Sequence, residues 1–268
     1  MLSPQALLAH YDSARLWGQD SGLDVAAAYQ GALAVRRLRE QRGEVPRGYK
    51  IGFTNRTIWP RYQVFAPIWG TVWDRTLQLC DGAGVVDLSG TCQPRLEPEA
   101  VFGLRATPPA NATLDQLFDC LDWVAPGFEV VQSHLPDWKF SAGDTVADGG
   151  LHARLLVGRR EPARELASSA TALEQQLTAA AVSLRRDGQE VEQGRGANVL
   201  EGPLHALHYF LRELRQCPGA PDLQAGDVVT TGTWTDAWPV QPGQTWAAEF
   251  DAPLSWLEVT FASVPAAS

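Results

Sequence analysis

Apolar positions recur with a helical period at the start of this chain and in short extended runs afterwards. Residues 4–19 and 22–42 carry apolar side chains three or four positions apart, which predicts two helices. Gly43 and Pro46 follow the second segment and are expected to end it. The pattern changes at residue 48, where short β-prone runs begin between glycines and prolines.

Most of the remaining chain is predicted to form strands. The runs are 49–54, 71–73, 85–88, 98–104, 128–131, 151–158, 227–231, 245–250 and 256–261. Residues 177–193 are typical of a hairpin with Asp187-Gly188 at its turn. Two helices interrupt the strands, one after an N-cap at Thr113 and one that opens at Pro203 with a leucine stripe.

Helices that precede β-rich structure, without regular strand–helix alternation, indicate an α+β fold rather than a doubly wound parallel sheet. We therefore expect a helical N-terminal region over 1–47 and a β-rich catalytic part over 48–268 in one continuous domain. The 268 residues are enough for a sizeable core.

Charge and composition exclude several classes of function. The net charge of −9 argues against binding to nucleic acid, and the sequence contains no stretch of apolar residues long enough to span a membrane. Met1–Leu8 shows no secretory signal pattern, so we expect a cytoplasmic protein. The four cysteines have no C-x-x-C spacing and are expected to be reduced.

Three glutamates form the strongest chemical signal. Glu97 and Glu99 lie two apart in a predicted strand and should share one face, while Glu129 is the acidic residue within an apolar run. Converging carboxylates need a cation between them, and Mg²⁺ or Mn²⁺ suits oxygen ligands. A chance pairing in an acidic chain is the alternative. Pro98 lacks a backbone donor, which predicts an edge strand or a strand start.

Weaker signals surround these glutamates. Lys50 lies within a predicted strand, either as an edge-strand charge that prevents aggregation or as a charge directed into a pocket. The turn Thr231-Gly232-Thr233 offers backbone N–H groups and hydroxyls to a carboxylate, or it simply ends a strand. Asp148 belongs to a glycine-ended loop over 144–150, and His152 follows it.

The order of these motifs resembles the 2-keto-4-pentenoate hydratase branch of the fumarylacetoacetate hydrolase superfamily. Six segments carry this resemblance in order. They are Lys-Ile-Gly-Phe-Thr at 50–54, Glu-x-Glu at 97–99, the isolated Glu129, Asp-Thr-Val-Ala-Asp at 144–148, Gly-Ala-Asn-Val-Leu-Glu-Gly-Pro-Leu at 196–204 and Ala-Gly-Asp-Val-Val-Thr-Thr-Gly-Thr at 225–233. The resemblance extends from about residue 5 to the C-terminus. It implies a β-rich roll of the superfamily's C-terminal-domain type, preceded by helices.

The resemblance also implies a function and a set of site residues. It predicts a hydratase that adds water to a 2-hydroxy-2,4-dienoate, with Mg²⁺ or Mn²⁺ held by Glu97, Glu99 and Glu129. Lys50 would serve catalysis, and Thr231–Thr233 would contact the small 2-oxo acid substrate. Such enzymes act in the meta-cleavage catabolism of aromatic compounds.

Three segments depart from the family pattern. Ala-Pro-Ile-Trp-Gly at 66–70 replaces Gln-Pro-Asp-Phe-Gly, Gln-Ser-His at 132–134 replaces Asp-Ser-Arg, and Gly-Gly-Leu-His at 149–152 replaces an Asn-Ala-Ser type. His134 is expected to contact the substrate. His152, His134 and Asp148 are the candidates for the general acid or base.

The sequence leaves other functions open. A decarboxylase of the 4-oxalocrotonate type or a C–C hydrolase of acylpyruvates would use the same metal centre. The altered positions also fit a non-catalytic partner subunit. We expect a homo-oligomer, with a hetero-complex with a related decarboxylase as the alternative.

Overall fold

Two helices open the chain in the computed structural model, which describes residues 2–262. They are α1 (Pro4–Ser13) and α2 (Val25–Gln41), capped by the side chains of Ser3 and Asp24. The first helix is shorter than the sequence predicts, because Ala14 adopts a left-handed conformation that ends it. Within residues 2–262, no helix combines the length and the apolar character that a membrane crossing requires.

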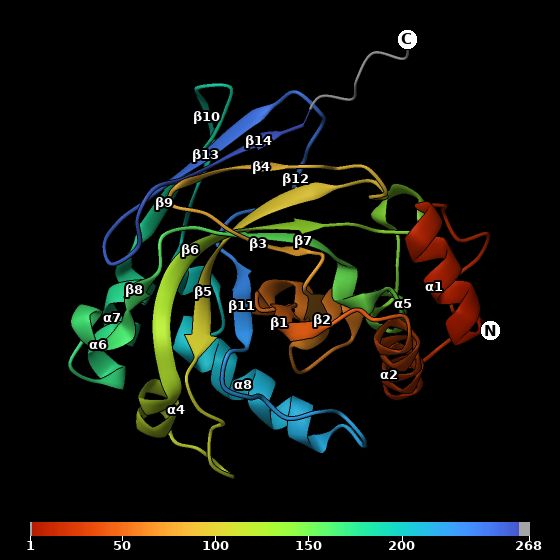
Figure 1. Cartoon of the computed structure of the whole chain (residues 1–268), viewed down its shortest axis with the longest axis horizontal. Coiled ribbons are helices and arrows are strands. Elements are labelled where there is room, and N and C mark those ends of the chain that lie inside the picture. Colours follow the sequence, from red (N-terminus) through yellow and green to blue (C-terminus); the bar gives the residue numbers. More distant parts are fainter. Residues whose placement is uncertain (1, 263–268) are drawn as a thin grey trace.

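A large curled sheet forms the centre of the molecule (Figure 1). Its main path runs β2-β1-β11-β5-β6-β7-β3, with β12 beside β5 and β8 beside β6. These strands are β1 (Pro46–Gly52), β2 (Ile68–Trp73), β3 (Leu77–Leu79), β5 (Arg95–Leu104), β6 (Leu121–Val131), β7 (His152–Val157), β8 (Glu161–Pro162), β11 (Val228–Thr233) and β12 (Trp238–Pro239). Strand β5 therefore lies inside the sheet, between β11 and β6.

A second sheet covers one side of the first (Figure 1). Its order is β10-β9-β13-β14-β4, made of β4 (Ala83–Val86), β9 (Ala181–Arg186), β10 (Gln189–Arg195), β13 (Thr245–Phe250) and β14 (Leu257–Phe261). Large buried side chains such as Trp234, Trp246 and Phe261 fill the main core.

The helices gather in two groups (Figure 1). α5 (Ala142–Ala147) packs against α2, so the N-terminal helices cover the end of the sheet where β2 lies. α4 (Leu114–Cys120), α6 (Ala163–Leu166), α7 (Ala170–Ala179) and α8 (Pro203–Gln216) lie on the other side, and α8 contacts β1, β2 and β11. Short helical turns are α3 (Trp59–Tyr62), η1 (Arg56–Ile58), η2 (Pro136–Trp138), η3 (Gly149–Leu151) and η4 (Gly196–Asn198).

The α+β order predicted from the sequence is confirmed, as are most strands and the helices after Thr113 and from Pro203. Two local predictions are wrong. The hairpin with Asp187-Gly188 at its turn is confirmed as β9 and β10, but its predicted start is wrong. Residues 177–179 end helix α7, because Ser169 caps that helix and buried leucines hold it. Most of the predicted loop at 144–150 is helix α5 and turn η3, because Ser141 and Asp144 form a capping box.

Pro98 is the third correction. It lies in an interior strand, although the sequence predicted an edge or a strand start. The carbonyl of Pro98 accepts a hydrogen bond from Trp234 N, so the Pro98 nitrogen faces the same side of β5. On that side β11 has already ended at Thr233, and β12 begins only at Trp238. The missing N–H therefore falls at a gap in the ladder and costs no strand-pairing hydrogen bond.

Candidate metal centre

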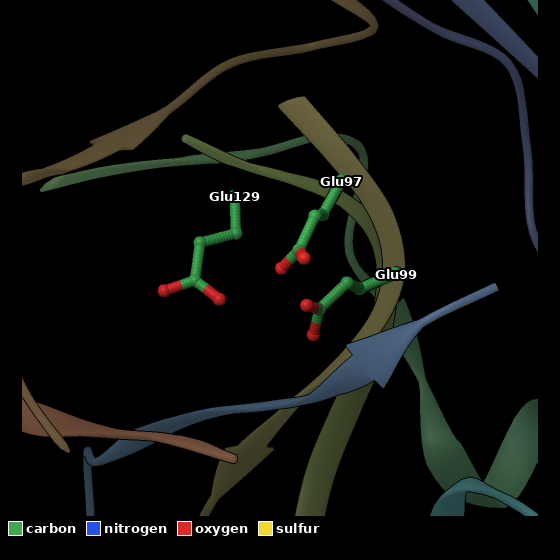
Figure 2. A group of neighbouring side chains, drawn as sticks. All are labelled: Glu97, Glu99 and Glu129. Atoms are coloured by element: carbon green, nitrogen blue, oxygen red, sulfur yellow. The ribbon is translucent and has the colours of Figure 1, made fainter. Parts of the chain in front are cut away.

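Three carboxylates meet on one face of the large sheet. Glu97 and Glu99 point to the same side of β5, and Glu97 lies directly opposite Glu129 on β6 in the antiparallel register. Figure 2 shows the three side chains turned toward one another. One carboxylate oxygen from each lies within 4.8 Å of the others.

The three carboxylates are shielded from solvent to different degrees. Glu99 and Glu129 are fully buried, and Glu97 is partly buried. Burial, reinforced by Glu129 and opposed by Lys50, raises the pKa of Glu97 to about 7. Burial and the two neighbouring glutamates raise the pKa of Glu99 well above its ordinary value. The protein alone therefore does not stabilise the state in which all three glutamates are ionised.

Lys50 is the cation closest to this cluster. Its Nζ lies 3.2 Å from Glu129 Oε2 and donates to Gly150 O at 2.9 Å. Burial opposes its charge, but Glu129, Glu97 and Glu99 together raise its pKa. Strand β1 lies between β2 and β11, so the edge-strand interpretation of Lys50 is wrong and the charge is directed inward.

Gly232 links β11 to the glutamates. Its N–H donates to Glu99 Oε2 at 2.7 Å. Its φ is +104°, and a Cβ there would lie 2.0 Å from Thr54 Oγ1, so this position requires glycine. The hydroxyls of Thr231 and Thr233 donate to backbone carbonyls, so the contact from this turn to Glu99 comes from the backbone.

His152 lies beside Glu129. Its Nδ1 is 2.8 Å from Glu129 Oε1, and its Nε2 is 2.8 Å from Thr76 Oγ1. Burial lowers its pKa despite the carboxylate contact, which favours the neutral ring. His152 therefore joins the metal-site glutamates through Glu129.

His134 and Asp148 form a separate pair. Asp148 accepts from the His134 backbone at 2.8 Å and lies 2.6 Å from its Nδ1, while Tyr11 and Trp17 flank the ring. Burial raises the pKa of Asp148, partly offset by His134. Within residues 2–262, no hydrogen bond joins this pair to the three glutamates. Their predicted roles toward substrate stay predictions.

Two positions near the site were not identified from the sequence. Thr76 contacts His152 from the turn after β2, and nothing in its sequence context marks it. Thr230 pairs in register with Lys50, and its buried hydroxyl has no partner among residues 2–262. The β-prone run into Thr231-Gly232-Thr233 is the signal that could have included Thr230.

The donor set fits a hard divalent cation. Glu99 Oε1 is buried and accepts no hydrogen bond within residues 2–262, and Glu129 Oε2 accepts none either, although Lys50 lies near it. Leaving such an acceptor unsatisfied costs about 1–3 kcal/mol, which a bound ion would remove. Oxygens that share octahedral Mg²⁺ at about 2.1 Å lie about 3 Å apart when adjacent and about 4 Å apart when opposite, so modest side-chain movements would bring the three glutamates into coordination.

Comparisons with known proteins agree with this chemistry. The sequence is 31% identical over 223 residues to the 2-hydroxyhexa-2,4-dienoate hydratase of Comamonas testosteroni, covering 82% of this chain and 80% of that one. It is 29% identical to the 4-oxalocrotonate decarboxylase of Pseudomonas sp. strain CF600, covering 89% of each. No protein-family model matches the sequence.

A solved structure shares the whole architecture. The 4-oxalocrotonate decarboxylase from Pseudomonas putida G7, complexed with magnesium and adipate, superposes with a TM-score of 0.84 at 26% identity, over 97% of this chain and 99% of the other. The relatives thus include both hydratases and decarboxylases at similar identity.

Proposed function

The chain belongs to the 2-keto-4-pentenoate hydratase branch of the fumarylacetoacetate hydrolase superfamily, and on this premise we propose a divalent-metal-dependent hydratase. It is an enzyme of the hydratase or decarboxylase type in meta-cleavage catabolism. Its proposed reaction adds water to a 2-hydroxy-2,4-dienoate to give a 4-hydroxy-2-oxo acid. The observation that carries this proposal is the convergence of Glu97, Glu99 and Glu129 beside Lys50.

Glu97, Glu99 and Glu129 would hold Mg²⁺ or Mn²⁺. When bound, the ion supplies Lewis-acid stabilisation of negative charge on the substrate carboxylate and C2 oxygen. The three carboxylates and a dication leave a net charge of about −1, to which an anionic substrate adds. A nearby cation is therefore needed.

Lys50 supplies that cation. Its hydrogen bond to Gly150 O and its ion pair with Glu129 fix the ammonium group at the edge of the carboxylate cluster. A fixed charge of this kind stabilises negative charge that develops at the C2 oxygen during reaction, at about 3–4 kcal/mol per donor. The Gly232 N–H orients Glu99 by donating to its Oε2.

The hydratase reaction also needs a proton at C5 and a water at C4. Asp148 and His134 are the proposed candidates for proton handling, because both ring nitrogens of His152 are engaged by Glu129 and Thr76. Thr231–Thr233 are proposed to bind substrate. We further propose a cytoplasmic homo-oligomer, with a partner-subunit role as the alternative.

Arg95 favours a second candidate function, decarboxylation. It lies two residues before Glu97 on the same face of β5, and its guanidinium rests 4.2 Å from the centre of the Trp138 ring. It makes no hydrogen bond or ion pair with residues 2–262, and burial lowers its pKa. A decarboxylase needs such a cation for the distal carboxylate of its substrate, so this candidate predicts a preference for dicarboxylates.

One assay separates the candidates. Purified protein with Mn²⁺ is given 2-hydroxypenta-2,4-dienoate, and loss of the dienol absorbance is followed. Rapid loss with formation of the 4-hydroxy-2-oxo acid supports the hydratase. Release of CO₂ from 4-oxalocrotonate without hydration of the dienoate supports the decarboxylase. Absence of both reactions in protein that binds Mn²⁺ favours the C–C hydrolase or the partner subunit.

A further inference from the structure

The ring of His152 fills the space between a metal-site glutamate and a tight turn. Nδ1 faces Glu129 Oε1 and Nε2 faces Thr76 Oγ1, each at 2.8 Å, and the side chain is 2% exposed. Both ring nitrogens are thus engaged by protein groups. No nitrogen remains for exchanging a proton with a substrate.

The chemistry of the partners assigns the protons. An ionised Glu129 can only accept, so Nδ1 carries the hydrogen and donates it. Nε2 forms the second hydrogen bond, with Thr76 Oγ1, and that hydroxyl is also placed to donate to Trp73 O at 3.1 Å. The Trp73 N–H in turn donates to Thr76 Oγ1 at 3.0 Å. A continuous series of hydrogen bonds therefore runs from the backbone of the turn to one oxygen of Glu129.

A β-bulge brings His152 to the correct face. Glu129 pairs with Leu155, whereas Val131 pairs with His152, so the register shifts by one residue between them. In a regular strand His152 and Leu155 would point to opposite faces, because they are an odd number of residues apart. The shift turns His152 to the side of Glu129, and bulges next to active sites commonly redirect a side chain in this way.

We propose that His152 is a positioning residue that fixes Glu129 for metal binding. It occupies Oε1 and sets the plane of the carboxylate, which leaves Oε2 directed to the ion beside Lys50. This inference rests on the proposed metal centre, and it gives His152 a role different from the acid or base suggested by the sequence. Hydrogen-bond partners of metal ligands typically contribute about 10–100-fold to metal affinity.

Two substitutions at His152 test the role. His152→Asn places an amide nitrogen where Nδ1 lies and keeps the donor to Glu129, whereas His152→Leu has similar bulk and no donor. We expect His152→Leu to weaken Mn²⁺ binding about 10–100-fold and His152→Asn to retain most of the affinity. Mn²⁺ affinity is measured by electron paramagnetic resonance or calorimetry, and the melting temperature of the metal-free protein is recorded alongside.

The outcomes separate positioning from simple packing. A packing role would lower the melting temperature of metal-free His152→Leu without changing the Mn²⁺ affinity of the folded protein, and unchanged affinity overturns the inference. Equal loss of affinity in the Asn and Leu variants overturns it as well. If His152→Leu does not fold, Thr76→Val removes the second hydrogen bond with little change of shape. Weaker Mn²⁺ binding in that variant supports the inference, and unchanged binding contradicts it.

A control distinguishes this inference from the proposed function. If the unmodified protein does not bind Mn²⁺, or if Glu99→Gln binds it equally well, the metal centre itself is wrong. If the unmodified protein binds Mn²⁺, Glu99→Gln does not, and His152→Leu binds normally, only the role of His152 is wrong.

Discussion

Two acidic clusters in this protein differ in how their charges are balanced. Near the N-terminal helices, Asp12 and Glu44 meet Arg39 and Arg42. Arg42 pairs with Asp12 at 2.6 Å and also with Glu44, and Arg39 Nε donates to Glu44 at 2.8 Å. The Arg39 guanidinium lies between the rings of Tyr11 and Trp73. Two arginines thus balance the charge of two carboxylates, and this cluster requires no bound cation.

The cluster of Glu97, Glu99 and Glu129 has no such balance. Three carboxylates share Lys50, and two of their buried oxygens accept no hydrogen bond within residues 2–262. The comparison shows that buried carboxylates indicate a bound cation only when the protein supplies too few cationic and hydrogen-bonding partners to balance them. Both clusters have short contacts and buried glutamates, but only the cluster of Glu97, Glu99 and Glu129 has negative charge that no protein cation balances.

The largest effect should come from the unbalanced cluster. We expect Glu99→Gln to reduce Mn²⁺ affinity more than about 100-fold and to abolish turnover, because one of three anionic ligands becomes neutral. Calorimetric titration with Mn²⁺ measures this directly. Unchanged affinity in Glu99→Gln, with the same result for Glu129→Gln, would refute the assignment of the ligands.

Lys50→Met should separate turnover from metal binding. Turnover should fall about 10²–10³-fold, because one donor to developing negative charge is lost. Mn²⁺ affinity should stay the same or rise, because a cation next to the ligands is removed. Steady-state kinetics under saturating Mn²⁺, together with titration of the metal, checks both parts; unchanged turnover in a variant that still binds Mn²⁺ would contradict the role.

The balanced cluster should respond in the opposite way. Glu44→Gln leaves Arg39 buried without its anionic partner, which should lower the free energy of unfolding by about 3 kcal/mol. Mn²⁺ affinity of the folded protein should not change. Urea unfolding and Mn²⁺ titration of the same sample provide the measurement, and a large loss of affinity would show that the two clusters are coupled.

The smallest effect concerns pH. The folded pKa of Glu97 is about 7, above its ordinary value, so the metal-free protein holds an extra proton between about pH 4.5 and 7. This contribution to stability is present at low pH and is lost as the pH rises through that range. Mn²⁺ must displace the proton, so its affinity should fall as the pH drops below 7.

Melting temperatures with and without Mn²⁺ at pH 6 and pH 8 test this. The stabilisation by Mn²⁺ should be larger at pH 8, and metal-free Glu97→Gln should show less loss of stability between the two pH values than the unmodified protein. Equal stabilisation by Mn²⁺ at both pH values would contradict the raised pKa.

Much of this fold could be predicted from local signals. The helical period before residue 48, the cap at Thr113 and the proline at 203 gave the correct element types. Pro98 led to a wrong prediction of an edge strand. Its missing N–H costs no hydrogen bond because it faces the gap between the end of β11 and the start of β12, and this gap cannot be identified from the local sequence. Helix α5 was missed because it is six residues long and held by burial rather than by a long apolar period.

The site was predictable where chemistry follows strand alternation. Glu97 and Glu99 had to share a face, whereas their approach to Glu129 depends on the β5–β6 register. The contact of His152 with Glu129 depends on a bulge, and that of Thr76 on a turn distant in sequence. Such contacts arise from tertiary geometry and leave no local pattern.

The central claim is that Glu97, Glu99 and Glu129 hold one divalent ion that binds a 2-oxo acid. A crystal soaked with Mn²⁺ and oxalate, measured at the manganese absorption edge, tests it most directly. The account predicts one anomalous peak between the three carboxylates, bonded to an oxygen of each and to oxalate. Density without a manganese peak there, or carboxylates turned apart around a peak elsewhere, would contradict it.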